Sequence, residues 1–214
     1  MADGLPDGGG VLDTGGDAHL REQTLHSERV LKGHFLQVVR DTVRLPCGRE
    51  ATREYVQHPG AVMVIGLLDD GRVVLERQYR HPVQRVMIEF PAGKLDAGEG
   101  SLVCARRELQ EETGYSAHEW AFAGRLAPTI GYADEIIDIW FARGLTLGER
   151  QLDDGEFLDV FTASSEELLG WCRSGDVIDG KTLVGALWLQ NVLRGDWSLE
   201  WSTNPSMDPR GSAA

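Results

Sequence analysis

Four charged residues in one short stretch have the types and spacing of a cation-binding site. The stretch Ser101–Thr113 carries Glu108 and Glu112 four residues apart, and Arg107 and Glu111 are also four apart. On an α-helix, residues four apart lie on the same face, about 40° apart around the axis. Two neighbouring carboxylates repel each other, and a divalent cation that takes their oxygens as ligands removes that penalty. Taken alone, the pattern favours an ordinary solvated acidic face, so the surrounding sequence must decide.

The same stretch also predicts how the acids are placed. Leu102, Ala105 and Leu109 form an apolar stripe at helical spacing, which we expect to dock on a sheet. Glu108 and Glu112 lie at the edge of that stripe, so they should point together into a partly buried cleft. Arg107 and Glu111 should form an ion pair on the next face.

The segment Gly93–Tyr115 as a whole resembles the Nudix box. A loop with Gly93 and Gly98 precedes the helix, and glycines let backbone approach a metal ion or phosphate closely. The box consists of a Gly, five residues, a Glu, seven residues, and then Arg-Glu-aliphatic-any-Glu-Glu-any-Gly-aliphatic. The corresponding residues here are Gly93, Glu99, Arg107, Glu108, Leu109, Glu111, Glu112, Gly114 and Tyr115, of which Tyr115 alone departs from the usual aliphatic type.

The resemblance implies a metal-dependent hydrolase that cleaves a diphosphate next to a nucleoside. By position, Glu108 and Glu112 are the main metal ligands, Glu111 is a ligand or a partner of one, and Arg107 orients the acids. The further implied metal contacts are Glu99, directly or through water, and the backbone carbonyl of Ala92. Mg²⁺ suits such an all-oxygen set, with Mn²⁺ as the alternative. Two or three ions would neutralise the diphosphate, and one would activate the attacking water.

Segments outside the box resemble the ADP-ribose pyrophosphatase branch of the family. They are REYVQHPGAV, ERQYRHPV, IEFPAGKL, GYADE and LDDGEFLDV, within roughly residues 34–194. The resemblance implies that Arg53 packs on the adenine, that Arg80 binds the diphosphate and that Glu135 lies near the terminal ribose. The plainer alternatives are an edge-strand charge for Arg53 and a surface arginine at a strand end for Arg80.

The late loop GEFLD lies where the branch carries a catalytic acid. The branch's pattern has two glutamates one residue apart, and here the positions hold Asp154 and Glu156. We expect Glu156 to act as general base, with the shorter Asp154 contributing less. If both acids only solvate the loop, the base moves to Glu111. A second departure is Ile130, where the branch usually has proline; it weakens the substrate assignment but not the family assignment.

The expected function is Mg²⁺-dependent hydrolysis of ADP-ribose to AMP and ribose 5-phosphate. The first alternative is pyrophosphate hydrolysis of another nucleoside diphosphate derivative, such as a sugar nucleotide or a dinucleotide. The second is a non-catalytic ADP-ribose sensor on the same scaffold. A sensor would have broken acidic positions or an appended DNA-binding domain, and every acid of the box is intact.

The elements around the box predict an α/β protein, a Nudix-type α/β/α sandwich with an additional N-terminal antiparallel sheet layer. Expected helices are residues 101–113, ended by Gly114, 164–174 and 182–194. Expected strands are 34–45, 51–58, 61–68, 72–80, 86–93, 121–125, 136–143 and 157–162. We divide the chain into a disordered tail (1–19), a strand layer (20–58), a Nudix domain (59–203) and a second tail (204–214). The branch implies that the strand layer, about residues 27–56, exchanges between subunits of a homodimer with the site between two chains.

Composition and net charge narrow the classes of molecule that this protein is expected to bind. The chain has 214 residues and a formal net charge of −13, and so acidic a protein is a poor ligand for nucleic-acid phosphates. Three cysteines without CxxC pairing argue against a disulfide framework or a zinc site and favour a reducing cytoplasm. No apolar run approaches the roughly 18 residues of a membrane span, and the first residues do not resemble a signal peptide. The expected partner is therefore a small nucleoside diphosphate, without nucleic acid or membrane.

Overall fold

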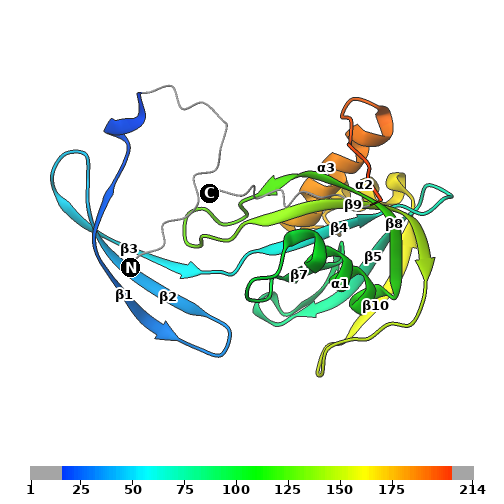
Figure 1. The fold of residues 1–214 in the computed structure, drawn as a ribbon, viewed down its shortest axis with the longest axis horizontal. Coiled ribbons are helices and arrows are strands. Elements are labelled where there is room, and N and C mark those ends of the chain that lie inside the picture. Colours follow the sequence, from blue (N-terminus) through cyan, green and yellow to red (C-terminus); the bar gives the residue numbers. More distant parts are fainter. Residues whose placement is uncertain (1–15, 204–214) are drawn as a thin grey trace. The chain divides into compact units, whose positions relative to one another are not determined.

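The structure is a computed structural model that describes residues 16–203. Its described part forms two compact units (Figure 1). The N-terminal unit comprises residues 16–58 with 129–134, and the larger unit comprises residues 59–128 with 135–203. Residues 1–15 and 204–214, which make up most of the two expected tails, lie outside the described residues. A short 3-10 helix, Asp17–His19, lies at the end of the first tail.

The N-terminal unit is a three-stranded antiparallel sheet in the order β1-β2-β3. Its strands are β1 (Gln23–Lys32), β2 (Gln37–Arg44) and β3 (Glu50–Gln57). Val39, Asp41 and Val43 are its buried residues, and they alternate on one face of β2 as a half-buried strand requires. Every residue of the edge strand β1 is exposed.

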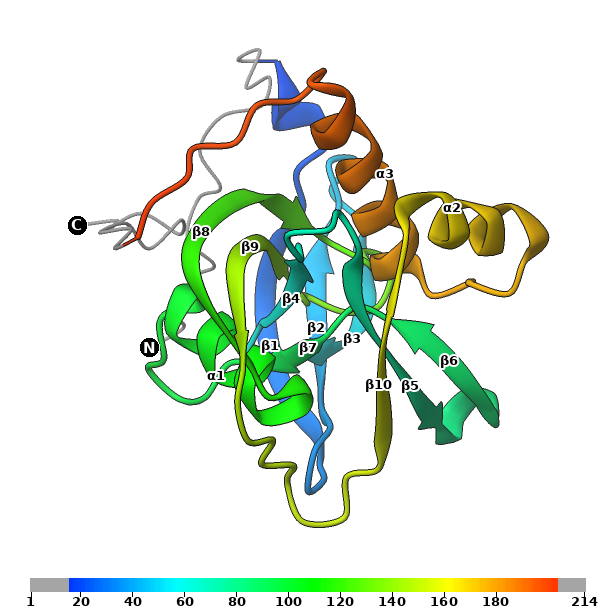
Figure 2. The same cartoon turned by 90° about the vertical axis from the view of Figure 1, so that its right-hand side faces the viewer.

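The larger unit is built on two sheets (Figure 2). One has the order β10-β5-β6, with β5 (Val73–Arg80), β6 (Arg85–Glu89) and β10 (Leu158–Ala163). The other has the order β7-β4-β9-β8, with β4 (Ala61–Gly66), β7 (Ala92–Lys94), β8 (Tyr115–Leu126) and β9 (Ile137–Leu147). The pairing of β4 with β9 is parallel, and the other pairings of these two sheets are antiparallel.

Helices cover both faces of the central strand β4. Its side chains alternate: Val62 and Val64 pack in one core with α1 (Ser101–Thr113), and Met63 and Ile65 pack in the other with α2 (Ser165–Ser174) and α3 (Gly180–Arg194). All six residues of β4 are buried, which explains its unbroken apolar sequence. The expected α/β/α sandwich with an N-terminal antiparallel sheet is confirmed.

The helix that carries the acids has the predicted bounds. It ends at Gly114, whose φ of 77° is the left-handed conformation that glycine adopts without strain. Ala105 and Leu109 of the predicted stripe are buried, and Leu102 is half-buried against the same core. Among residues 16–203, no helix is long and apolar enough to cross a membrane.

Candidate active site

Arg107 contacts three acids, of which two lie on α1 and one lies in the loop before it. Its guanidinium donates to both carboxylate oxygens of Glu99, at 2.9 and 2.8 Å. It also donates to Glu108 at 2.7 Å and to Glu111 at 3.0 Å, the latter being the predicted pair four residues apart. Hydrogen bonding to Arg107 lowers the pKa of Glu99 to about 2. Arg107 therefore favours the ionised form of Glu99 and holds the three carboxylates close together.

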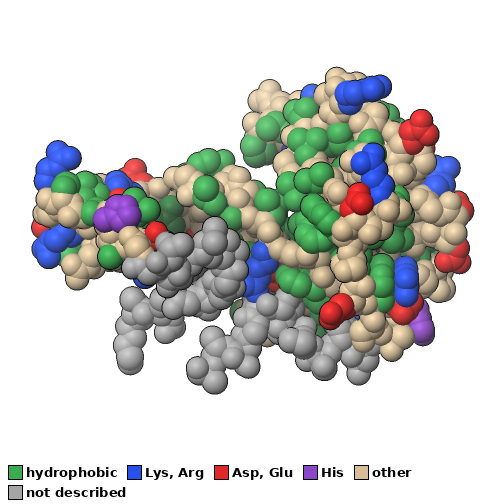
Figure 3. Space-filling model, turned by 90° about the horizontal axis from the view of Figure 1, so that it is seen from above, with side chains coloured by type: hydrophobic (Ala, Val, Ile, Leu, Met, Phe, Trp, Pro, Cys, Tyr) green, Lys and Arg blue, Asp and Glu red, His purple; other side chains and the backbone are tan. Residues whose placement is uncertain are grey.

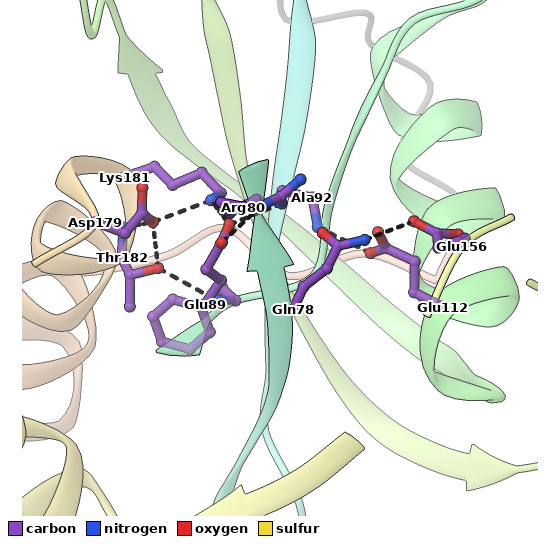
Figure 4. A network of polar contacts seen from close by, with 10 residues as sticks. Gln78, Arg80, Glu89, Ala92, Glu112, Glu156, Asp179, Lys181 and Thr182 are labelled. Atoms are coloured by element: carbon purple, nitrogen blue, oxygen red, sulfur yellow. Dashed lines mark hydrogen bonds and ion pairs between the residues drawn. The ribbon is translucent and has the colours of Figure 1, made fainter. Parts of the chain in front are cut away.

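Glu112 lies deeper, on the flank of α1 that faces β7. It is 3% exposed and accepts a hydrogen bond of 3.0 Å from the backbone N–H of Ala92 (Figure 4). Burial, and then the charge of Glu76, raises the pKa of Glu112 well above its usual range. The acid is thus held by backbone in a setting that disfavours its charge unless a cation compensates.

Gly93 is needed for the approach of Glu108 to the same backbone. A Cβ at Gly93 would lie 1.9 Å from the carboxyl carbon of Glu108, so any larger residue would displace the acid. Burial also raises the pKa of Glu108, although Arg107 opposes that effect. The first glycine of the box therefore lets the two principal acids, Glu108 and Glu112, lie directly against β7.

Strand β5 supplies the facing wall. Glu76, Gln78 and Arg80 share one face because side chains alternate along a strand, and Arg77 and Tyr79 point to the other, exposed side. The amide of Gln78 donates to Glu156 at 3.2 Å, which brings the late loop to the acids of α1 (Figure 4).

A second charged network adjoins this wall (Figure 4). Arg80 makes two parallel hydrogen bonds, of 2.8 and 2.9 Å, to Glu89 on β6. Lys181, at the start of α3, forms ion pairs with Glu89 and with Asp179, the residue that caps α3. Burial alone would raise the pKa of Glu89, but Arg80 and Lys181 outweigh it and lower that pKa. The network fixes the guanidinium of Arg80 at the edge of the acidic region. The Arg80 side chain as a whole is 40% exposed.

The late loop separates its two candidate acids. Glu156 is half-buried, and its backbone N–H donates to the carbonyl of Asp153. Gly155, with φ of 85°, makes the turn between them. Asp154 is exposed. Of the two, Glu156 is the one that the structure brings to the acids of α1.

Comparison with known proteins supplies the family. The Nudix domain model matches residues 57–182, more than half of the chain. This chain belongs to the Nudix family. A second model, the nucleoside diphosphate sugar hydrolase N-terminal domain, matches residues 22–56. The family predicted from the box is therefore confirmed, and the N-terminal sheet of this Nudix protein is itself similar to a known module.

Relatives of this Nudix protein include two ADP-ribose pyrophosphatases. One, from Bacillus subtilis, is 38% identical over 80% of this chain and 94% of its own length. The other, from Mycobacterium tuberculosis, is 40% identical over 86% of this chain and 93% of its own length. A solved structure described as an ADP compounds hydrolase has a TM-score of 0.75 at 21% identity, covering 82% of this chain and 96% of that one, and it supports the fold.

The acids of this Nudix site suit a divalent cation in their chemistry. Their donors are hard carboxylate oxygens, and both oxygens of the fully buried Glu76 have no hydrogen-bond partner. Within residues 16–203, no three His, Cys, Asp or Glu side chains are drawn together tightly enough to enclose an ion as they stand.

The two remaining predicted site residues, Arg53 and Glu135, belong to different units. Arg53 belongs to the N-terminal unit, where it forms an ion pair with Glu22, with 2.9 Å between Nε and Oε2, and donates to the carbonyl of Thr52. Glu135 is half-buried and belongs to the larger unit.

Sequence reasoning did not identify four polar residues of this region, which are Glu76, Gln78, Glu89 and Lys181. The available signal was the strand alternation that places Glu76 and Gln78 on the face of Arg80. Polar residues at inward positions of a strand mark a site, because burying them without a partner is costly.

Proposed function

We propose that this Nudix protein hydrolyses ADP-ribose to AMP and ribose 5-phosphate in a Mg²⁺-dependent reaction. The observation that carries the proposal is the buried acidic wall formed by Glu108 and Glu112, with Glu156 brought to it through Gln78. Arg80 lies at the end of the same face of β5. The similarity to two ADP-ribose pyrophosphatases over most of the chain supports the choice of substrate.

The reaction joins a water oxygen to one phosphorus and breaks the P–O bond to the bridging oxygen, so both products are phosphate monoesters. Mg²⁺ bound by Glu108 and Glu112, with Glu99, Glu111 and the Ala92 carbonyl as further candidate ligands, would neutralise the diphosphate and lower the pKa of the attacking water. Glu156 accepts the proton of that water, with Glu111 as the alternative base. Asp154 is too exposed to be the first choice.

Arg80 is proposed to bind the diphosphate. Its bidentate bond to Glu89 fixes one edge of the guanidinium, and the partial exposure of the side chain leaves donors for phosphate oxygens. For Arg53 and Glu135 we retain the proposed contacts with the adenine and the terminal ribose.

We also propose a homodimer formed through the N-terminal sheet. A lone three-stranded sheet with two buried valines has little core of its own. It exposes Leu25, Val30, Leu31, Phe35 and Leu36, and apolar side chains are visible at its surface in Figure 3. A two-fold dimer would cover these side chains and the open edge of β1. Light scattering at micromolar concentration should give twice the chain mass, and a monomer would contradict the proposal.

A reducing compartment, the cytoplasm, is proposed from the cysteines. Cys47, Cys104 and Cys172 are all free thiols, and Cys104 is fully buried. A protein kept in an oxidising compartment would more often pair such residues.

A substrate panel tests the proposed specificity. The description of the matching N-terminal domain, a nucleoside diphosphate sugar hydrolase, makes sugar nucleotides the second candidate class. We expect kcat/KM for ADP-ribose to exceed that for ADP-glucose, GDP-mannose and NADH by about tenfold or more, which corresponds to about 1.4 kcal/mol of differential transition-state binding. A sugar nucleotide that ranks first would move the assignment to the second class.

A further inference from the structure

Three buried oxygen atoms on one face of β5 have no hydrogen-bond partner. They are both carboxylate oxygens of Glu76 and the amide oxygen of Gln78. Glu76 has 0% exposure, and Gln78 uses its amide nitrogen to bind Glu156. Buried polar atoms in folded proteins nearly always have a partner, so three unpartnered acceptors on adjacent inward positions point to a missing electron-pair acceptor.

The surroundings of Glu76 explain why no side chain supplies that partner. On one side, the cations Arg80 and Lys181 are both engaged by Glu89. On the other side, Glu76 interacts unfavourably with the carboxylates of Glu112 and Glu156. Glu76 is therefore the cross-strand neighbour of Glu89, whose cations are already engaged, and it is repelled by the carboxylates of Glu112 and Glu156.

We propose that Glu76 is an additional oxygen ligand of a divalent cation shared with Glu112, and that the amide oxygen of Gln78 contacts the same ion through a bound water. The inference rests on the proposed cation-dependent function. It adds a ligand from β5, which lies outside both the box helix and the late loop. The three unpartnered atoms are hard oxygen donors of the kind that Mg²⁺ and Mn²⁺ accept, and none is a nitrogen or sulfur.

The competing occupant is an ordinary buried water molecule. Water would satisfy the same lone pairs, but it brings no charge. A bound cation and a bound water therefore differ in one measurable respect: only direct ligation of the cation makes metal affinity depend on the length of side chain 76 as well as on its charge.

Direct metal titration tests the proposal without relying on turnover. Isothermal titration of Mg²⁺ and Mn²⁺ is compared for the full chain and for Glu76→Gln, Glu76→Asp and Glu112→Gln. The matched control is Asp138→Asn, another buried carboxylate, which forms an ion pair with Arg125 on the β8-β9 hairpin. We expect Glu76→Gln to weaken binding by about tenfold or more and Glu76→Asp by at least about threefold, whereas the control stays within about twofold.

Each outcome of the titration decides whether Glu76 is a metal ligand. If Glu76→Gln and Glu76→Asp both bind Mn²⁺ as the unmodified chain does, Glu76 is not a ligand. If only Glu76→Gln is weakened, the side chain acts through its charge at a distance, and ligation is also overturned. Circular dichroism establishes that each variant is folded; should Glu76→Gln not fold, Glu76→Asp carries the decision. If Glu112→Gln also binds normally, the failure belongs to the proposed cation site as a whole and not to Glu76 alone.

Discussion

Without a divalent cation, the stability of this protein should fall as pH rises from about 5 to about 8. Burial, and then the charge of Glu89, raises the pKa of Glu76 from 4.5 to about 8. An acid whose pKa is raised by folding binds its proton more tightly in the folded state. Its stabilising contribution is therefore complete below the unfolded pKa, near 4.5, and is lost as pH rises through the folded pKa, near 8.

The shift sets the size of the effect. A pKa raised from 4.5 to about 8 on folding corresponds to a loss of about 5 kcal/mol as an upper bound. That is comparable with the whole stability of many domains, about 5–15 kcal/mol. Glu112 shares this burial and its pKa is raised too, so the two acids titrate as a pair and their effects do not simply add. Glu99, with its pKa lowered to about 2, titrates below this window and does not offset the loss.

Urea unfolding at pH 5, 6, 7 and 8 in the presence of EDTA measures this dependence. Glu76→Gln serves as the comparison, because it keeps the shape of the side chain and removes the titrating group. The free energy of unfolding should fall more steeply with pH for the unmodified chain than for the variant. Equal slopes for the two proteins, or stability that rises across this window, would refute the reasoning.

Three further predictions concern catalysis. Glu112→Gln should lower turnover of ADP-ribose at millimolar Mg²⁺ by about a hundredfold or more, because it removes a ligand charge. The circular dichroism spectrum should stay unchanged, because the glutamine can keep the hydrogen bond from Ala92. Normal turnover would show that Glu112 does not belong to the site. Glu156→Gln should lower kcat by about 10²–10⁴-fold with a smaller change in KM, and Asp154→Asn should cost less; losses below about threefold for both would move the base to Glu111. Arg80→Gln should lower kcat/KM by about 10–100-fold, the effect of one lost charged hydrogen-bond pair, with Lys181 still paired to Glu89; an unchanged kcat/KM would make Arg80 purely structural.

Local rules were sufficient for the element that carries the box. The apolar stripe of α1 fixes which face is buried, and Gly114 fixes where the helix ends. Spacing within one helix also predicted the pair between Arg107 and Glu111. These features depend on neighbours within a few residues, so one sequence contains all the information that they require.

The element missed by sequence reasoning is β1. Its sequence, QTLHSERVLK, has no regular alternation, and the structure shows why: all ten residues are exposed, so no buried face imposes a pattern. β8 and β9 are longer than predicted because their ends pair with each other beyond the buried part, as with Tyr115 and Leu147. Backbone pairing between strands leaves little trace in either sequence alone.

The polar face of β5 could not be predicted from the sequence for a different reason. Glu76 faces acids that are more than thirty residues away in the chain, and Lys181 reaches Glu89 across 92 residues. Such contacts depend on which strands are neighbours in the sheet. The spacing of residues within one segment does not determine that strand order. The alternation of side chains along a strand could predict only that Glu76, Gln78 and Arg80 share one face of β5.

Phosphorus NMR of ADP-ribose incubated with the purified chain tests the central claim most directly. With Mg²⁺, the diphosphate signals should be replaced by two phosphate monoester signals in equal amounts, assigned to AMP and ribose 5-phosphate by added standards. With EDTA in place of Mg²⁺, the diphosphate should persist. An unchanged diphosphate in the presence of Mg²⁺ and folded protein, or equal hydrolysis in EDTA, would contradict the account.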